Sequence, residues 1–223
     1  MNGILNRMLR WLFFNGPVRV FVLLALGVHV RHRERLPEQG PAIIVANHNS
    51  HLDTLLLMSL LPARTLPRVR PVAAGDYFLR NRFLAWFARE IIGIIPIRRG
   101  GGGHTDPLVP VDAALERGEI VIFFPEGTRG EPERLAPLKK GIFHLARRHP
   151  GVPVIPVWIQ GAGRALPRGE ALFVPFFCDL AVGAPLYGHD AGAGWLETLR
   201  TRMCALQSEL PALHWYEDPD DED

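Results

Sequence analysis

Short apolar runs alternate with amphipathic segments along most of the chain. The runs predict buried strands at 42–46, 94–97, 120–124 and 154–159, with two further short strands between Leu172 and Val182. Apolar residues at helical spacing predict helices at 54–61, 78–87, 107–117, 138–149 and 195–210. Helices that alternate with strands indicate a mostly parallel sheet. We therefore expect a single α/β domain, with a mixed, mostly parallel sheet flanked by helices.

The first 36 residues have a different pattern, with two apolar stretches separated by a predicted break. Trp11 to Phe14 is followed by Asn15-Gly16-Pro17 and then by the run Val20 to Val28. A spanning helix needs about 20 mostly apolar residues, which neither stretch provides. Residues 1–36 are therefore expected to form an interfacial, membrane-associated helical segment.

Arginines flank these stretches and would contact anionic headgroups, namely Arg7, Arg10, Arg31, Arg33 and Arg35. Two alternatives stay open. The segment could be a helix that covers the protein's own core, or a signal peptide cleaved near Ala25-Leu26-Gly27.

Charge is distributed unevenly along the chain. The formal net charge is +2, but the last seven residues carry six acids, which leaves residues 1–216 at +8. Residues 213–223 are expected to be a solvated acidic tail, and 37–212 the basic domain. A basic domain favours a phospholipid surface, a phosphorylated metabolite or nucleic acid, but no nucleic-acid-binding motif is present. The two cysteines lie far apart in the sequence and predict neither a disulfide framework nor a cysteine metal site. This usage is typical of proteins in a reducing cytoplasm.

A polar cluster follows the predicted strand at 42–46 and contains His48 and Asp53. One tight turn could bring this carboxylate to the imidazole, which would fix the ring tautomer and leave the other nitrogen to act as a base. The pair could also be purely structural. A metal site that includes His51 is a further alternative, although the spacing matches no common zinc motif.

Arginines follow two other predicted strands. Arg98 and Arg99 come after 94–97, ahead of a glycine run at 100–103 that is expected to be a surface loop. Phe124-Pro125-Glu126-Gly127-Thr128-Arg129 follows 120–124, and Lys139 and Lys140 lie before the next helix. A guanidinium group can donate two parallel hydrogen bonds to a phosphate, so these residues predict an anion clamp. The block at 124–129 could instead be a salt-bridged turn, and Lys139 and Lys140 could belong to an ordinary solvated helix start.

Taken together, these clusters resemble the lysophospholipid and glycerol-phosphate acyltransferases. The matching blocks are Asn-His-x-x-x-x-Asp ending at Asp53, Gly-x-x-x-x-x-Arg at 93–99, Phe-Pro-Glu-Gly-Thr-Arg at 124–129 and Val-Pro-x-x-Pro at 152–156. The resemblance spans residues 42 to about 160. It implies that His48 and Asp53 are catalytic and that Arg99, Glu126 and Arg129 hold the acceptor's phosphate. Gly127, Thr128 and Lys140 are expected to complete the substrate site. Asn49 and His51 depart from the family pattern, in which Gln and an aromatic residue are common at these positions. These departures bear on which acceptor the enzyme uses more than on its chemistry.

The expected activity is transfer of a fatty acyl group from acyl-CoA or acyl carrier protein to the hydroxyl of lysophosphatidic acid or a related lysolipid. No cofactor or metal is expected, and the enzyme would work at the cytoplasmic face of the cell membrane. No Gly-x-Ser-x-Gly elbow is present, which favours direct transfer, although Ser50 stays a candidate nucleophile. Glycerol 3-phosphate and a lyso-amino-acid lipid are alternative acceptors. A hydrolase or a non-catalytic module that binds anionic lipids are alternative functions.

Overall fold

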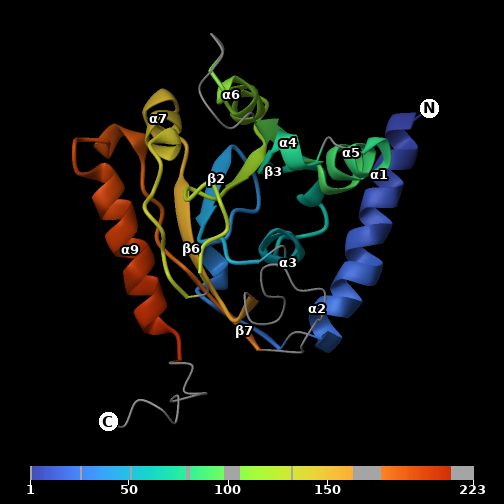
Figure 1. Ribbon diagram of the computed structural model, residues 1–223, viewed down its shortest axis with the longest axis horizontal. Helices are drawn as coiled ribbons and strands as arrows, with labels where there is room; N and C mark the ends of the chain where they lie inside the picture. Colours follow the sequence, from blue (N-terminus) through green and yellow to red (C-terminus); the bar gives the residue numbers. More distant parts are fainter. Residues whose placement is uncertain are drawn as a thin grey trace.

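A seven-stranded sheet forms the centre of the protein, as seen in the computed structural model, which describes residues 2–25, 27–50, 52–78, 81–97, 106–131, 133–162 and 177–211 (Figure 1). The strands follow the order β1-β7-β6-β2-β5-β3-β4. Every neighbouring pair is parallel except β6 and β7. The strands are β1 (Val28–Arg31), β2 (Ala42–Ala46), β3 (Val69–Ala74), β4 (Ile95–Ile97), β5 (Ile120–Phe123), β6 (Val154–Gln160) and β7 (Cys178–Val182). The predicted mixed, mostly parallel sheet is confirmed.

Helices cover both faces of this sheet. One face packs on α3 (Leu52–Leu60) and on the amino-terminal helices, and the other packs on α6 (Val109–Glu116), α7 (Gly141–Arg148) and α9 (Trp195–Glu209). The run of β2 is wholly apolar because both of its faces are buried. Ala42, Ile44 and Ala46 pack in the core on the α3 face of the sheet, and Ile43 and Val45 pack in the core on the opposite face. A central strand buried on both faces has no solvent-facing position.

Several predicted elements are confirmed and two strands were missed. The strand at 42–46 and the helix at 195–210 match their observed bounds within one residue. Helix α3 begins at Leu52, two residues before the prediction, and this places Asp53 in its first turn. The pattern did not indicate β1, an edge strand with alternating burial, or β3, which contains Arg70 and Pro71.

The remaining segments differ from the prediction mainly at their ends. Asp106 caps a turn through the N–H of Leu108, so that α6 starts at Val109 and not at Pro107. The predicted helix at 78–87 consists of α4 (Gly75–Phe78), α5 (Arg82–Trp86) and a π-helical turn, η4 (Phe87–Ile92). Of the two strands expected between 172 and 182, β7 is observed. The acidic tail, the glycine run and the remainder of that region lie outside the described residues.

The amino-terminal helix is continuous, and the expected break at Asn15-Gly16-Pro17 was wrong. Helix α1 (Asn2–Phe13) passes through a π-helical turn (Phe14–Val18) that contains Pro17 and then into α2 (Arg19–Ala25). A π-helical turn accommodates the missing N–H of proline. Among the described residues, no helix has the length and apolar character required to cross a bilayer.

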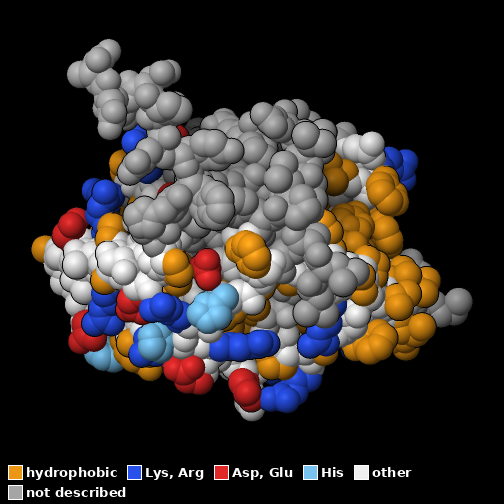
Figure 2. Space-filling view, turned by 90° about the horizontal axis from the view of Figure 1, so that it is seen from below, with side chains coloured by type: hydrophobic (Ala, Val, Ile, Leu, Met, Phe, Trp, Pro, Cys, Tyr) orange, Lys and Arg blue, Asp and Glu red, His pale blue; other side chains and the backbone are white. Residues whose placement is uncertain are grey.

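This helix has two apolar faces. Phe14, Val18 and Val22 are buried in the core, so the interpretation of the segment as a cover for the protein's own core is correct for this face. The outward face carries exposed apolar side chains, namely Ile4, Leu5, Met8, Trp11, Leu12 and Val20. Figure 2 shows hydrophobic side chains gathered at the edge of the molecule where α1 and α2 lie.

Candidate active site

The polar cluster that contains His48 lies at the carboxyl end of β2, between the ends of β5 and β6. The segment from Asn47 to Ser50 has no regular structure and leads directly into α3. Side chains at this edge of a parallel sheet are free to face a ligand, because the strands themselves end below them.

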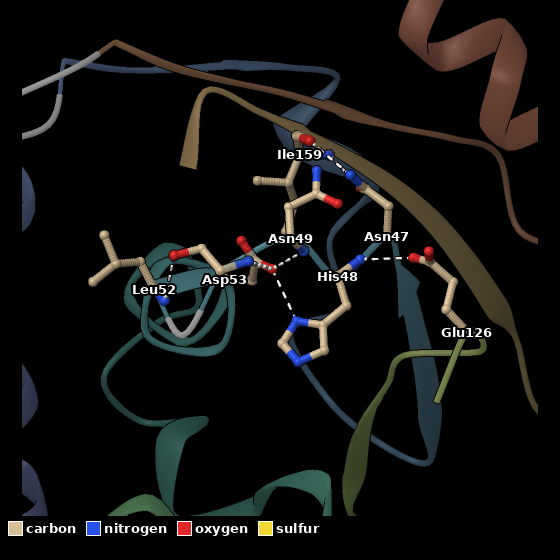
Figure 3. A network of polar contacts seen from close by, with 8 residues as sticks. Asn47, His48, Asn49, Leu52, Asp53, Glu126 and Ile159 are labelled. Atoms are coloured by element: carbon tan, nitrogen blue, oxygen red, sulfur yellow. Dashed lines mark hydrogen bonds and ion pairs between the residues drawn. The ribbon is translucent and has the colours of Figure 1, made fainter. Parts of the chain in front are cut away.

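His48 and Asp53 are in direct contact (Figure 3). The Nδ1 atom of His48 lies 2.9 Å from Oδ2 of Asp53, and the second ring nitrogen points away from the carboxylate. The Asp53 side chain is 1% exposed and that of His48 is 19% exposed. A buried carboxylate that accepts the Nδ1 proton holds the ring in the tautomer whose Nε2 is a base. The predicted contact between His48 and Asp53 is therefore confirmed, and the role of His48 as a base stays a prediction.

The first turn of α3 fixes the Asp53 carboxylate. Its Oδ2 also accepts hydrogen bonds from the backbone N–H groups of Asn49 and Ser50, each 2.8 Å long. The Ser50 Oγ accepts the N–H of Leu52, as expected of a helix-capping residue, and Ser50 is buried. Because its hydroxyl is buried in this cap, Ser50 is poorly placed to act as a nucleophile.

The loop after β5 holds the His48 backbone from the other side. The N–H of His48 donates to Oε1 of Glu126 over 2.8 Å, and the carbonyl of His48 accepts the N–H of Gly130 over 2.9 Å. The imidazole stacks on the ring of Phe124, with centroids 4.1 Å apart and an interplanar angle of 22°. The Phe-Pro-Glu-Gly-Thr-Arg block thus contacts His48 through the ring of Phe124 and the carboxylate of Glu126, and Gly130, the residue after the block, adds a backbone hydrogen bond.

Glu126 supports the site through its backbone partners. Its Oε1 accepts from His48 and its Oε2 accepts the N–H of Ala136 over 2.9 Å. Burial raises the pKa of this carboxyl above its usual value, while the two backbone hydrogen bonds act in the opposite direction. These contacts indicate that Glu126 positions His48, and the expected contact of Glu126 with substrate stays a prediction.

Asn47 joins β2 to β6 beyond the last residue of β2. Its side-chain nitrogen donates to the carbonyl of Ile159 over 2.8 Å, and its oxygen accepts the N–H of Ile159 over 2.7 Å (Figure 3). The amide thus continues the strand pairing with a side chain. This interaction fixes the start of the segment that carries His48.

Replacing Asn47 with alanine is expected to lower the free energy of unfolding by about 2–4 kcal/mol, because the buried N–H and C=O of Ile159 lose their partners. Urea unfolding followed by circular dichroism measures the change. Asn15→Ala, which removes two exposed hydrogen bonds, one to the carbonyl of Trp11 and one from Arg19, is the control and should change stability by less than about 1 kcal/mol. Equal changes in the two variants would contradict a structural role for the Asn47 amide.

The other predicted substrate-binding residues are placed as follows. Gly127 has φ +71°, and a methyl group there would approach Nζ of Lys139 to 2.7 Å, so the Lys139 side chain covers this turn. Thr128 is exposed and Arg129 half-buried in the same loop, while Lys140 is exposed just before α7. Arg99 and His51 lie outside the described residues.

Within the part of the chain that is described, no three His, Cys, Asp or Glu side chains group as metal ligands.

Sequence reasoning did not assign roles to Asn47, Phe124 and Gly130. The first two lie inside motifs that were recognised, and their positions at the ends of buried strands were the available signal. Gly130 acts through its backbone N–H, which no side-chain pattern can indicate.

The protein is a three-layer α/β fold with a histidine at the carboxyl edge of its sheet, in contact with a buried aspartate, which is an arrangement typical of general-base enzymes. A model of the acyltransferase family matches residues 27–160, and the chain therefore belongs to this family. The matched region contains β2, the His48 cluster and the loop after β5.

Known proteins similar to this chain include two 1-acyl-sn-glycerol-3-phosphate acyltransferases. The chloroplastic protein BAT2 of Brassica napus is 33% identical over 171 residues, which cover 71% of this chain and 44% of the relative. The Bacillus subtilis protein is 28% identical over 210 residues, which cover 90% of this chain and 98% of the relative. The chain thus spans about half the length of the plant relative and nearly all of the bacterial one.

A solved structure supports the fold. The crystal structure of the 1-acyl-sn-glycerophosphate acyltransferase PlsC from Thermotoga maritima superimposes with a TM-score of 0.68 at 22% identity, and covers 95% of this chain and 100% of the other. This likeness confirms a single α/β domain with a mostly parallel sheet.

Proposed function

We propose that this protein transfers a fatty acyl group from a thioester donor to the free hydroxyl of lysophosphatidic acid. The observation that carries the proposal is the 2.9 Å contact between His48 and the buried Asp53 at the carboxyl edge of the sheet. The acceptor is supported by the relatives, which are named as 1-acyl-sn-glycerol-3-phosphate acyltransferases. Acyl-CoA and acyl carrier protein are both suitable donors for the basic domain.

The chemistry follows from the orientation of the imidazole. The Nε2 of His48 takes the proton of the acceptor hydroxyl as its oxygen attacks the thioester carbonyl carbon. A tetrahedral intermediate forms, the carbon–sulfur bond then breaks, and the departing thiolate receives the proton from His48. Asp53 stabilises the imidazolium between these two proton transfers. The step needs no covalent acyl-enzyme.

The acceptor's phosphate is proposed to bind at the loop after β5 together with Arg99. Arg129 follows Glu126 in the loop that is hydrogen-bonded to the His48 backbone, and Lys139 covers Gly127. Positive charge beside the base would hold the phosphate while the hydroxyl approaches Nε2. Thr128 and Lys140 are proposed to complete this site.

Incubation of the purified full chain with one labelled acyl-CoA and a series of acceptors tests the proposal. Labelled phosphatidic acid should form with lysophosphatidic acid, at a higher kcat/KM than any product formed with glycerol 3-phosphate or another lysolipid. Labelled free fatty acid that forms equally with and without an acceptor would identify a hydrolase and overturn the proposal. Replacement of acyl-CoA by acyl carrier protein in the same assay identifies the donor.

We further propose that the outward face of α1 and α2 binds the cytoplasmic surface of the cell membrane, where the acceptor resides. Exposed apolar side chains with the spacing of one helix face support this position, because they would enter the boundary between headgroups and acyl chains. On α5, Phe83 is 71% exposed, and its ring lies 5.9 Å from that of Trp86. The face therefore extends beyond the amino-terminal helix.

Changing Ile4 and Met8 together to serine should weaken binding to phosphatidylcholine vesicles about 100-fold, because each exposed apolar side chain contributes roughly 1–2 kcal/mol when it leaves water. Vesicle flotation measures the binding. Val109→Ser, which alters an exposed apolar residue on α6, should leave it unchanged. A loss of equal size in both variants would exclude a specific membrane-facing side.

A further inference from the structure

A cavity lies at the edge of the sheet opposite the His48 cluster. Its volume is about 820 Å³, and it is bounded by α1, η4 and the amino ends of β3, β4 and β5. All three strands are parallel to β2, so their amino ends lie across the sheet from its carboxyl edge. The arginines that line the cavity are Arg7, Arg10, Arg68, Arg70, Arg89 and Arg117. Among the described residues, the carboxylates that line it with them are Glu90 and Glu119.

The acids compensate only part of this charge. Glu119 is paired with Arg70 at 3.0 Å and with Arg117 at 2.9 Å, and Glu90 accepts a hydrogen bond from Asn6. Among the described residues that line the cavity, arginines outnumber acids by six to two, a formal excess of four positive charges. Such an excess in a hollow attracts anions.

Arg10 is the deepest of these arginines. It is 5% exposed, and its Nη2 donates to the carbonyl of Val69 over 2.8 Å. Its Nε is buried, and no partner for it occurs in the described part of the chain. The expectation that Arg10 lies at the protein surface among headgroups was therefore wrong. A buried donor without an acceptor is costly unless a ligand satisfies it.

Gly93 lets two guanidinium groups approach each other. A methyl group at Gly93 would collide with Nη1 of Arg10 and would come within 2.8 Å of Nη1 of Arg70, so both atoms lie against the surface of this residue. Burial and the neighbouring Arg70 lower the pKa of Arg10 to about 10, while Glu119 raises it. Two like charges held together inside a cavity would be stabilised by an anion between them.

The outward apolar face of α1 borders this cavity. Trp11 lines the cavity and is 57% exposed, and Arg7 lies one helical turn before it. A helix that lies in the headgroup layer would hold the mouth of the cavity at the depth of the lipid phosphates. This arrangement favours a lipid headgroup over a soluble anion as the occupant.

We propose that the cavity between α1 and the amino ends of β3 and β5 binds the phosphate headgroup of an anionic phospholipid, at a site separate from the catalytic one. The inference rests on the membrane position proposed for α1. Exposed arginines at 7, 68 and 89 contact the phosphate oxygens at the mouth, and Arg10 and Arg70 provide positive charge at the inner wall. The protein would thereby select anionic membranes, whatever acceptor its active site takes.

The test compares vesicles of phosphatidylcholine alone with vesicles that also contain phosphatidylglycerol. In a combined Arg7→Gln, Arg68→Gln and Arg89→Gln variant, the affinity for the anionic vesicles should fall about 100-fold, since each surface arginine contributes roughly fivefold. The affinity for pure phosphatidylcholine should not change, because Ile4 and Met8 are retained. A variant with lysine at these three positions keeps the charge but loses the planar fork, and should also bind the anionic vesicles more weakly.

The control variant replaces Arg147, Arg200 and Arg202 with glutamine, on α7 and α9 at the far side of the molecule (Figure 1). Equal weakening of the two glutamine variants, or full affinity of the lysine variant, would show diffuse electrostatic attraction and overturn the proposed site.

A different outcome would assign the cavity to a soluble anion and overturn the lipid as its occupant. This outcome is binding of inorganic phosphate that depends on residues 7, 68 and 89, without any preference for anionic vesicles. Acyl transfer to a water-soluble short-chain acceptor should persist in the glutamine variant, and its loss would overturn the separation from the catalytic site. Absence of acyl transfer by the unmodified protein would refute the proposed function and leave the vesicle comparison valid.

Discussion

Replacing His48 with alanine is expected to lower kcat/KM for acyl transfer to lysophosphatidic acid by about 10³- to 10⁴-fold, because the reaction loses its general base. The fold should survive, since the imidazole is only partly buried. Asp53→Asn should cause a loss of similar size, because the amide cannot stabilise the imidazolium or hold Nδ1 protonated. Initial rates of phosphatidic acid formation measure both changes.

The chain contains a matched control for this prediction. His149 contacts Asp112 over the same distance of 2.9 Å, and its imidazole is shielded from solvent to a similar degree, although Asp112 is more exposed than Asp53. This second pair joins α7 to α6 and is not part of the His48 cluster. His149→Ala should therefore leave kcat/KM nearly unchanged per folded molecule. Unaltered activity in His48→Ala, or equal losses in the two alanine variants, would end the catalytic assignment and favour a lipid-binding module.

Removal of the Glu126 carboxylate should have the second largest effect. In Glu126→Ala, the N–H groups of His48 and Ala136 lose their acceptor, and the free energy of unfolding is expected to fall by about 3–5 kcal/mol. Activity should fall as well, because the His48 backbone is no longer held against the loop after β5. Urea unfolding and initial rates measure these losses. Glu131→Gln, in the same loop but exposed and paired only with Arg134 among its described contacts, should change neither by a comparable amount.

The pH dependence gives an independent check on Glu126. Because the folded-state pKa is raised above the unfolded value, the folded protein binds the proton more tightly than the unfolded chain does. The resulting stabilisation is fully present below the unfolded pKa and is lost as the pH rises through the folded pKa. Glu126→Gln should remove this component, so the difference in unfolding free energy between the two proteins should vary across that window and be constant outside it. A constant difference across the window would contradict the raised pKa.

The sequence alone determined the features that depend on neighbouring residues. Strands β2, β5 and β6 are buried on both faces, so each appears as an unbroken apolar run. His48 and Asp53 are five residues apart, and a single helix start is sufficient to bring them together. Their chemistry could therefore be predicted before any strand order was known.

Tertiary structure decided every contact between distant segments. Glu126 reaches His48 across 78 residues because β5 pairs with β2, and Arg10 reaches Val69 because α1 packs beside β3. The continuous amino-terminal helix also depends on packing, since burial of Phe14 and Val18 stabilises a turn whose proline predicts a break. Local sequence encodes periodicity and the chemistry of single turns. The order of strands in the sheet results from burial of the whole chain. It alone placed Glu126 against His48 and brought together the arginines that line the cavity beside α1.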